Sequence, residues 1–426
     1  MRHVAGRFER IKSSQQLAPF RIADFRLFWI GAFFSFVGTW VQTVAQGYFV
    51  YELTHDRAKL AMVSFCSMLP VSILGPFAGS LTDNLDRRKV LIISQLIFGF
   101  NALFIASAVY FGFIQYWHIL VIATVNGIAS TFEMPCRQSL VSNIVPSEHL
   151  SAAVPMQAMT FNMARIIGPA IGGILLQRIG AQACYVVNGL SYMALVFAVI
   201  AIKANLSSFK PRTEPVIDLF IEGFRYTWKN TQLRTLWLME CTLSVFGLAY
   251  LPLLPAFAKD VLRLKESGLG NLYTAIGIGA MIGLTTLITF SNRPIKGFVV
   301  KAAMLTFGIA LISASTVHNY TVALISLGLC GMSAIMQFNT TNTLFQILSP
   351  DRLRGRVLTM HIWALSGAGP IALPLFGYVA QQYGVATAMR LGGLIVLIGA
   401  LIVWNQRHRL SGVDSAVSEK LIEAKG

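Results

Sequence analysis

Three ionisable residues of this sequence lie inside long apolar runs, where a charge is costly: Glu133, Arg165 and Glu240. A carboxyl group shielded from water binds a proton more readily. Glu133 or Glu240 is therefore a candidate proton carrier, and Arg165 a candidate for promoting the release of that proton. A static ion pair between Glu133 and Arg165 is the alternative, and the sequence leaves both interpretations open.

No pattern typical of an enzyme accompanies these residues. The sequence shows no nucleophile–base arrangement, no His-rich metal cluster and no phosphate-binding Gly loop. The five cysteines are scattered without the spacing of metal ligands or of a disulfide framework: Cys66, Cys136, Cys184, Cys241 and Cys330. We therefore expect no enzymatic reaction, no metal and no cofactor.

Polar residues recur at helical spacing in two other apolar runs. One set is Thr39, Gln42, Thr43 and Gln46; the other is Asn339, Asn342, Thr343 and Gln346, preceded by Gln337. Polar faces of helices in lipid should point inward, so both sets predict a substrate cavity, with interhelical hydrogen bonding as the alternative. Aromatic residues that would add an apolar wall are Phe36, Trp40, Tyr250, Phe338 and Trp363. We interpret His361 as a packing residue rather than a proton relay.

The elements that must position these residues are apolar runs of about 20 residues, the length that crosses a bilayer. Twelve such runs occur, at 27–52, 60–82, 90–113, 116–136, 152–177, 181–202, 234–258, 268–290, 297–317, 320–348, 356–382 and 386–405. In hydrocarbon every backbone group must bond internally, so the runs are helices. With 55% hydrophobic and 12% charged residues, the chain is predicted to be an all-α integral membrane protein.

The basic residues set the predicted orientation. The net charge is +16, but Lys and Arg cluster between apolar runs rather than forming a nucleic-acid surface. Most of the 34 lie in the tails and in every second loop, whereas few, such as Arg57, Lys259 and Arg263, lie on the other side. The positive-inside rule then places both termini in the cytoplasm.

The two halves of the chain repeat each other. Residues 25–29 read FRLFW and 233–237 read LRTLW, and Glu52 and Asp260 correspond at the same spacing. Such repeats typify transporters in which two bundles rock about a shared site. The predicted domains are an N-terminal tail 1–26, a six-helix bundle 27–203, a linker 204–232 with an amphipathic helix on the membrane surface, a second bundle 233–405 and a tail 406–426. A solvated linker is the alternative to the amphipathic helix.

The connection after the second run reads GSLTDNLDRRK at 79–89. An acid before the turn and bases after it can lock a gate, with Asp83 capping the next helix or pairing with an arginine. The segment resembles the loop signature of the major facilitator superfamily, keeping Gly79, Leu81, Asp83, Arg87 and Arg88. It has Asn84 and Asp86 where the signature has an arginine and a glycine. The equivalent segment of the second half, near 291–293, has lost the pattern.

The fifth run reads ARIIGPAIGG at 164–173. It resembles the antiporter signature of that superfamily at Gly168, Pro169, Gly172 and Gly173, with Ala164 in the first place. Small residues at this spacing let a second helix approach. We expect the partner to be the eighth run, with Ala275, Gly279 and Gly283, and the alternative is that each face packs against some other helix. Together with PCRQSL at 135–140, the motif resembles the drug:proton antiporter-3 family, which includes macrolide and siderophore exporters.

The resemblance implies a proton-coupled exporter in the bacterial inner membrane, acting by alternating access on a drug or a secreted metabolite. Its partners would be a small-molecule substrate, protons and membrane lipid, with no nucleic acid, and the protein would be a monomer. The alternatives are a facilitator or proton symporter that imports a polar solute, and a membrane enzyme. The identity of the substrate is not encoded in any single motif.

Overall fold

The computed structural model describes residues 15–83, 85–204, 216–291, 293–406, 410, 412–415 and 417–418. These residues contain twelve helices that are long and apolar enough to cross a membrane, which confirms the predicted count, and they form no strand. Most of both predicted tails, residues 205–215 of the linker, the surroundings of Gly79 and the side chain of Asp83 lie outside what the structure describes. The predicted tail, bundle and linker boundaries remain predictions.

The contacts divide the chain into two compact units. Unit 1 comprises the described residues within Met1–Ala45, Ala78–Ile114 and Ile128–Arg212. Unit 2 comprises those within Gln46–Phe77, Gln115–Gly127 and Thr213–Gly426. One end of spans one and four, and almost all of span two, therefore belong to the same unit as the second half of the chain.

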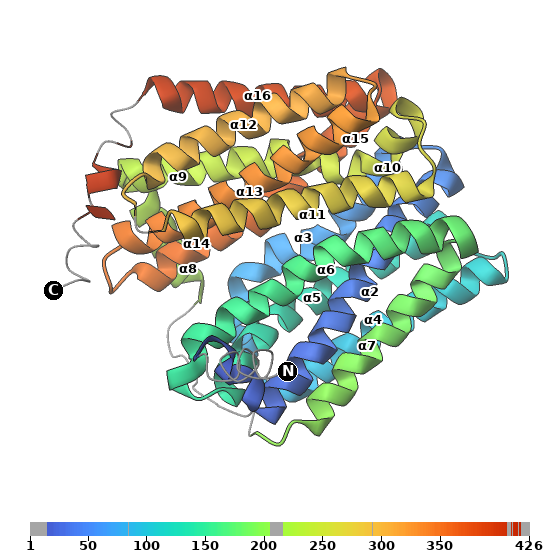
Figure 1. Ribbon diagram of the computed structural model, residues 1–426, viewed down its shortest axis with the longest axis horizontal. Coiled ribbons are helices and arrows are strands. Elements are labelled where there is room, and N and C mark those ends of the chain that lie inside the picture. The colour runs from blue at the N-terminus through green and yellow to red at the C-terminus, as the bar shows by residue number, and fades with distance from the viewer. Residues whose placement is uncertain are drawn as a thin grey trace, which may run out of the picture. The chain divides into compact units, whose positions relative to one another are not determined.

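Unit 1 holds spans three, five and six and the larger parts of spans one and four. Its elements, three of which continue into unit 2, are η1 (Gln15–Arg21), α2 (Ala23–Thr54), α3 (Arg57–Asp83), α4 (Arg87–Tyr110), α5 (Tyr116–Ile144), η2 (Ser147–His149), α6 (Leu150–Ile179) and α7 (Ala181–Ala201). Helices α4 and α7 run side by side (Figure 1). The fully buried core of this unit includes Phe25, Phe28, Leu91, Leu140 and Leu195.

Unit 2 holds the remaining spans. Its elements are α8 (Val216–Lys229), α9 (Thr231–Thr242), η3 (Leu243–Gly247), η4 (Leu248–Leu253), α10 (Leu254–Ala256), η5 (Phe257–Val261), α11 (Glu266–Thr289), α12 (Lys296–Thr316), α13 (Tyr320–Leu348), α14 (Arg354–Ile362), η6 (Trp363–Gly367), η7 (Gly369–Ala372), α15 (Leu373–Tyr383) and α16 (Val385–Asn405). Helix α13 packs between α11 and α12, and α12 packs on α16 (Figure 1).

Spans seven and eleven are broken helices. Span seven runs from α9 to η5, and span eleven from α14 to α15. Each contains a wide π-helical turn, η3 or η6, and proline follows in both, at Pro252 and Pro370. Proline lacks the N–H that an α-helix needs, and π turns shift the hydrogen-bond register locally. The two spans can therefore bend where ordinary helices would stay straight.

Helix α8 is docked on the start of span eleven. Gly223 packs against the backbone of Arg356, so that a side chain at this position would collide with it. Glu222 forms ion pairs with Arg356 and Arg352. The face of α8 that these contacts leave uncovered carries exposed apolar side chains: Ile217, Ile221, Phe224 and Trp228. An apolar stripe of this kind suits a membrane surface.

Five aromatic side chains form a cluster between α8, α9 and η6: Phe220, Phe224, Trp228, Trp237 and Trp363. The rings of Trp237 and Trp363 stack, with centroids 6.1 Å apart and planes 13° apart. Trp228 meets Trp237 edge-on at 6.3 Å. This aromatic cluster joins the connecting helix to both broken spans.

Candidate functional site

Glu240 and His361 form a buried pair between the two broken spans. Glu240 is 0% exposed and His361 is 3% exposed. The His361 Nδ1 lies 2.9 Å from both carboxylate oxygens, and its hydrogen bond runs to Oε2. Among the described residues, Oε1 has no hydrogen-bond partner. The sequence identified Glu240 as a site residue but assigned His361 to packing.

Hydrogen bonds on either side hold this pair in register. The Trp237 indole N–H donates to the Met360 carbonyl at 3.2 Å, and the Ser244 hydroxyl donates to the Leu365 carbonyl at 3.0 Å. Glu240 and His361 each stand within three residues of a π-helical turn. The pair therefore lies where the two spans are both tied together and able to bend.

Glu133 has a different kind of partner. Its carboxylate forms a buried ion pair with Arg137, one turn later on α5. Gln95 donates to the same carboxylate at 3.5 Å and in turn accepts from Ser35 at 3.1 Å. The Arg137 guanidinium also lies 4.5 Å from the centre of the Phe36 ring. Because arginine keeps its charge at physiological pH, Glu133 has a permanent counter-ion.

Arg165 lies on α6 with its guanidinium 5.7 Å from the centre of the Trp40 ring. The antiporter-like residues of the same helix are all buried: Ala164, Gly168, Pro169, Gly172 and Gly173. Their close neighbour is α2, because a Cβ on Gly168 would lie 2.5 Å from that of Trp40, and one on Gly172 would lie 3.0 Å from the Val41 carbonyl oxygen.

The small face predicted on span eight is also occupied within its own unit. A methyl group on Gly279 of α11 would collide with the Gly328 carbonyl of α13, and one on Gly283 would meet Met332. The predicted pairing of the span-five face with the span-eight face is therefore wrong. Each small face instead allows close packing against a helix of its own half, α2 or α13.

The two arginines of the first-half loop motif form hydrogen bonds with neighbouring segments. Arg87 donates to the Asn143 side chain at 3.1 Å, and Arg88 donates to the carbonyls of Ile202 and Ala204 at 2.5 and 3.2 Å. The cap of α4 is Asp86, whose carboxylate accepts from the backbone N–H of residues 88 and 89. The capping role expected of Asp83 thus belongs to Asp86, the residue that replaces a glycine of the signature.

The polar set of the first half takes part in interhelical hydrogen bonds. Asn188 of α7 donates to Gln42 at 2.6 Å, and Thr39 lies 3.2 Å from the Tyr192 hydroxyl. Thr43 donates to the Thr39 carbonyl on its own helix. Thr39 and Gln42 therefore take part in interhelical hydrogen bonding, the alternative to a cavity, and they link α2 to α7.

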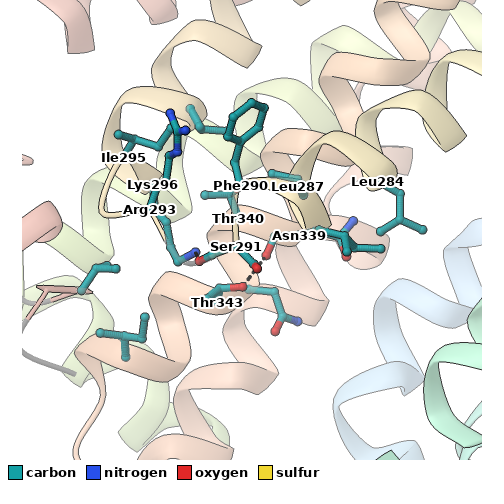
Figure 2. A pocket seen from close by; sticks show the side chains of 15 residues that line it. Leu284, Leu287, Phe290, Ser291, Arg293, Ile295, Lys296, Asn339, Thr340 and Thr343 are labelled. Atoms are coloured by element: carbon teal, nitrogen blue, oxygen red, sulfur yellow. Dashed lines mark hydrogen bonds between the residues drawn. The ribbon is translucent and has the colours of Figure 1, made fainter. Parts of the chain in front are cut away.

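Three members of the polar set of the second half line a cavity of about 480 Å³ in unit 2, and Gln346 does not. Asn339, Asn342 and Thr343 of α13 contribute to its wall, as do Arg293 and Lys296 (Figure 2). Gln337 does not line this cavity; it is fully buried, and neither atom of its amide has a partner among the described residues.

A cluster of ion pairs that the sequence analysis did not identify joins the far ends of spans one, two, seven and eight. We call it the ion-pair cluster: Tyr48, Tyr51, Glu52, Arg57, Lys259, Asp260 and Glu266. Lys259 pairs with Glu52, and Arg57 contacts Asp260 at 2.7 Å. The feature of the sequence that could have pointed to this cluster is that Glu52 and Asp260 occupy equivalent positions of the repeat.

Two tyrosines tighten the ion-pair cluster. Tyr51 donates to Asp260 at 2.6 Å, and Tyr48 donates to Glu266 at 2.8 Å. The two repeat-related acids, Glu52 and Asp260, thus each bind a base from the opposite half of the sequence. In this structure the cluster holds the predicted outer ends of the two halves together.

Known proteins resemble this chain over nearly its whole length. A family model described as transmembrane secretion effector matches residues 14–424. The staphyloferrin A transporter of Staphylococcus aureus is 26% identical over 395 residues, 90% of this chain and 96% of that protein. The multidrug efflux pump Tap of Mycolicibacterium fortuitum is 26% identical over 389 residues, 87% of this chain and 93% of that protein.

Macrolide efflux protein A of Streptococcus pyogenes is 22% identical over 387 residues, 89% of this chain and 94% of that protein. Among solved structures, a POT family transporter in complex with 5-aminolevulinic acid has a TM-score of 0.74 at 11% identity, covering 91% of this chain and 96% of that chain. The xylose transporter XylE from E. coli, inward open, has a TM-score of 0.65 at 12% identity, covering 89% and 94%. The two structures share the fold.

Proposed function

The chain belongs to the transmembrane secretion effector family of major facilitator transporters, and from this premise we propose that it exports a small amphipathic molecule in exchange for protons. It is an integral membrane transporter of a small molecule, not an enzyme. What we propose is that transport is outward, that protons are the coupling ion, and that particular residues carry them. The span-five motif, which resembles the antiporter signature, supports exchange over uptake.

The observation that carries proton coupling is the Glu240–His361 pair. With one proton between them the pair is neutral overall, as carboxylate and imidazolium or as carboxyl and imidazole. A second proton leaves a net positive charge, and loss of the only proton leaves a net negative one. Since an uncompensated charge is costly in a buried site, each change in protonation favours a rearrangement of the two bendable spans.

Among the described residues, the surroundings of this pair supply no second ion-pair partner. Titratable groups on the elements packed against it are Arg234 and Cys241 on α9, Arg354 and Arg356 on α14, Tyr320 and Cys330 on α13, Arg390 on α16, and Asp218, Glu222, Arg225, Tyr226 and Lys229 on α8. Arg356 pairs with Glu222, and Arg354 with Asp351. Among the described residues, the charged partner of Glu240 is His361.

Alternating access supplies the rest of the mechanism. The ion-pair cluster holds the predicted outer ends together, so an outward opening must break the Glu52–Lys259 and Arg57–Asp260 pairs. We propose that proton binding at Glu240 and His361 favours one of the two states and that substrate favours the other. Linkage then makes the two bound species compete, as exchange requires.

The experiment uses inverted membrane vesicles that are acidified inside and loaded with a pH-sensitive acridine dye. The probes follow the relatives: a macrolide, ethidium as a multidrug probe, and staphyloferrin A. Exchange predicts that a transported probe releases protons and restores the fluorescence. We expect Glu240→Gln and His361→Gln to abolish this recovery, because each removes one of the two proton-binding groups of the pair.

The matched control is Glu148→Gln, which removes the acid of an exposed Glu–His pair, Glu148 with His149 at 3.9 Å. It should behave as the parent protein does. Undiminished recovery in Glu240→Gln would contradict the assignment of the pair. A probe that is taken up by whole cells together with protons would favour import instead. Such a probe would release no protons from the inverted vesicles.

A further inference from the structure

A cavity of about 480 Å³ lies at the predicted cytoplasmic end of α11, α12 and α13. Leu284, Leu287 and Ile288 of α11 form one wall, and the connection after α11 and the start of α12 form another (Figure 2). The volume is within the range of small-molecule sites, which are typically about 300–1,000 Å³. The function proposed above does not make use of it.

Its charged groups are both basic. Arg293 and Lys296 line the cavity, and no acidic residue does so among the described residues. The Arg293 guanidinium lies 5.0 Å from the centre of the Phe290 ring, and among the described residues it has no carboxylate partner. Lys296 donates to the Ser291 carbonyl at 3.0 Å, which leaves two further N–H donors.

One acid outside the cavity wall, Asp414, acts on Lys296. Asp414 acts electrostatically on Lys296, but its carboxylate Oδ1 accepts the backbone N–H of Gly297 at 2.8 Å. Asp414 does not line the cavity. One positive charge therefore remains in excess around a cavity whose guanidinium and ammonium donors are available to an anion.

The facing wall on α13 is polar. Asn339, Asn342 and Thr343 line it together with Thr340 (Figure 2). Thr340 is 4% exposed, and among the described residues its hydroxyl has no hydrogen-bond partner. A buried hydroxyl without a partner costs free energy, so a ligand atom that bonds to it would be stabilised.

We propose that this cavity binds an amphipathic anion: a carboxylate or phosphate group held by Arg293 and Lys296, with an apolar body against α11. Arginine suits both head groups because its planar donors match their oxygens. The apolar residues Leu284 and Leu287 of α11 would contact this body. The head group can come from a free amphiphile or from an anionic membrane lipid. The site does not require proton coupling.

The test is calorimetric titration of the full-length protein in nanodiscs of phosphatidylcholine, without a pH gradient. The probes are octyl phosphate, octanoate and, as a cationic control, octyltrimethylammonium. The proposal predicts binding of both anionic probes and at least about a tenfold increase in Kd for the double variant Arg293→Gln/Lys296→Gln, the loss of about 1.4 kcal/mol. The cationic probe should bind weakly to both proteins.

The matched control is Arg352→Gln/Lys301→Gln. It removes the same charges from an exposed arginine and from a lysine of α12 that lies over the Trp404 ring rather than in the cavity. It should retain the parent Kd. Equal Kd values for the parent and the cavity variant, with equal thermal melting, would overturn the proposal. So would equal affinity for the cationic and anionic probes.

The two sources of the head group are distinguished by adding phosphatidylglycerol to the nanodiscs. If the natural occupant is a lipid, phosphatidylglycerol raises the Kd of octyl phosphate for the parent and not for the cavity variant. If it is a free amphiphile, phosphatidylglycerol leaves the Kd unchanged. Failure of proton release in inverted vesicles would contradict the proposed exchange without affecting this binding measurement.

Discussion

Glu133 and Glu240 are both buried acids of membrane-spanning helices, yet their partners differ in whether they can lose their charge. The partner of Glu133 is an arginine, and that of Glu240 is a histidine. Imidazole can be neutral or charged near neutral pH, whereas a guanidinium cannot lose its charge there. Glu133 is therefore suited to joining elements of unit 1, and Glu240 to exchanging a proton.

This difference predicts opposite costs for the same substitution. Glu133→Gln leaves the buried Arg137 without its counter-ion, and breaking a buried pair in this way costs about 3–5 kcal/mol. Glu240→Gln should cost less, because it leaves no permanently charged partner in the buried site. Thermal melting of the purified variants in detergent should show a much lower midpoint for Glu133→Gln.

Substitution of Arg137, the ion-pair partner of Glu133, provides the control. Arg137→Gln should restore part of the midpoint when combined with Glu133→Gln, because the double variant buries no net charge. A melting midpoint for Glu133→Gln equal to that of the parent would rule out a stabilising role for this ion pair.

The sequence reveals the acids but not their partners. A charge in an apolar run is visible in one sequence, which is why Glu133, Arg165 and Glu240 could be identified. His361 is 121 residues from Glu240, and only the folded contact distinguishes it from a packing residue. Arg137 lies just beyond the predicted end of span four, so it was counted with a loop although α5 continues to Ile144.

At the scale of elements, the glycines of α6 permit a close approach to α2. The carbonyl of Val37 and the side chain of Trp40 would lie 2.9 and 2.5 Å from a Cβ on Gly168. These distances are shorter than ordinary van der Waals contact. The motif that resembles the antiporter signature thus determines, in this structure, how spans one and five pack.

A bulkier residue there should separate the two helices. Gly168→Val is expected to destabilise the protein by about 1–3 kcal/mol, the typical cost of overpacking, and to lower the melting midpoint. Gly355→Val is the matched control, because nothing lies within 4 Å of a Cβ at that exposed helical position. Equal midpoints for the two variants would disprove the close packing.

The ion-pair cluster predicts a second effect at this scale. In a background without native cysteines, Glu52→Cys and Lys259→Cys joined by a short bis-maleimide should hold spans one and seven together. Because the outward opening separates these ends, transport of a macrolide by cross-linked protein in vesicles should fall to background.

A cross-link within one half serves as the control. Glu222→Cys and Arg356→Cys replace an ion pair that docks α8 on α14, and their linkage should leave most transport intact. Full transport by the protein linked between positions 52 and 259 would show that these ends do not separate.

The number and lengths of the membrane-spanning helices could be predicted from the sequence, but their π-helical turns and packing partners could not. Twelve runs of apolar residues sufficed for twelve spans because lipid imposes one solution on the backbone. The π-helical turns of spans seven and eleven precede Pro252 and Pro370, but hydropathy does not depend on the hydrogen-bond register and so does not reveal them. The partner of a small face is likewise a tertiary property, which explains the wrong pairing of spans five and eight.

At the scale of the whole molecule, the orientation in the membrane remains a prediction. An impermeant maleimide should label Ser14→Cys and Ser418→Cys only after the membrane is permeabilised, because the positive-inside rule places both ends in the cytoplasm. His318→Cys, in a short connection on the predicted outer side, should react in intact cells.

Labelling of all three positions in the opposite sense would invert the orientation and the direction of the proposed export. Labelling of the two terminal positions on different sides would contradict an even number of spans. The count of twelve and the sidedness are thus tested separately by one set of cysteines.

The stacked rings of Trp237 and Trp363 give the protein an optical reporter of its own. Two indoles at 6.1 Å and 13° couple their electronic transitions, and each ring stands three residues or fewer from one member of the buried acid–imidazole pair. Bending of either broken span alters that coupling, so near-ultraviolet circular dichroism can follow the transport cycle without any attached label.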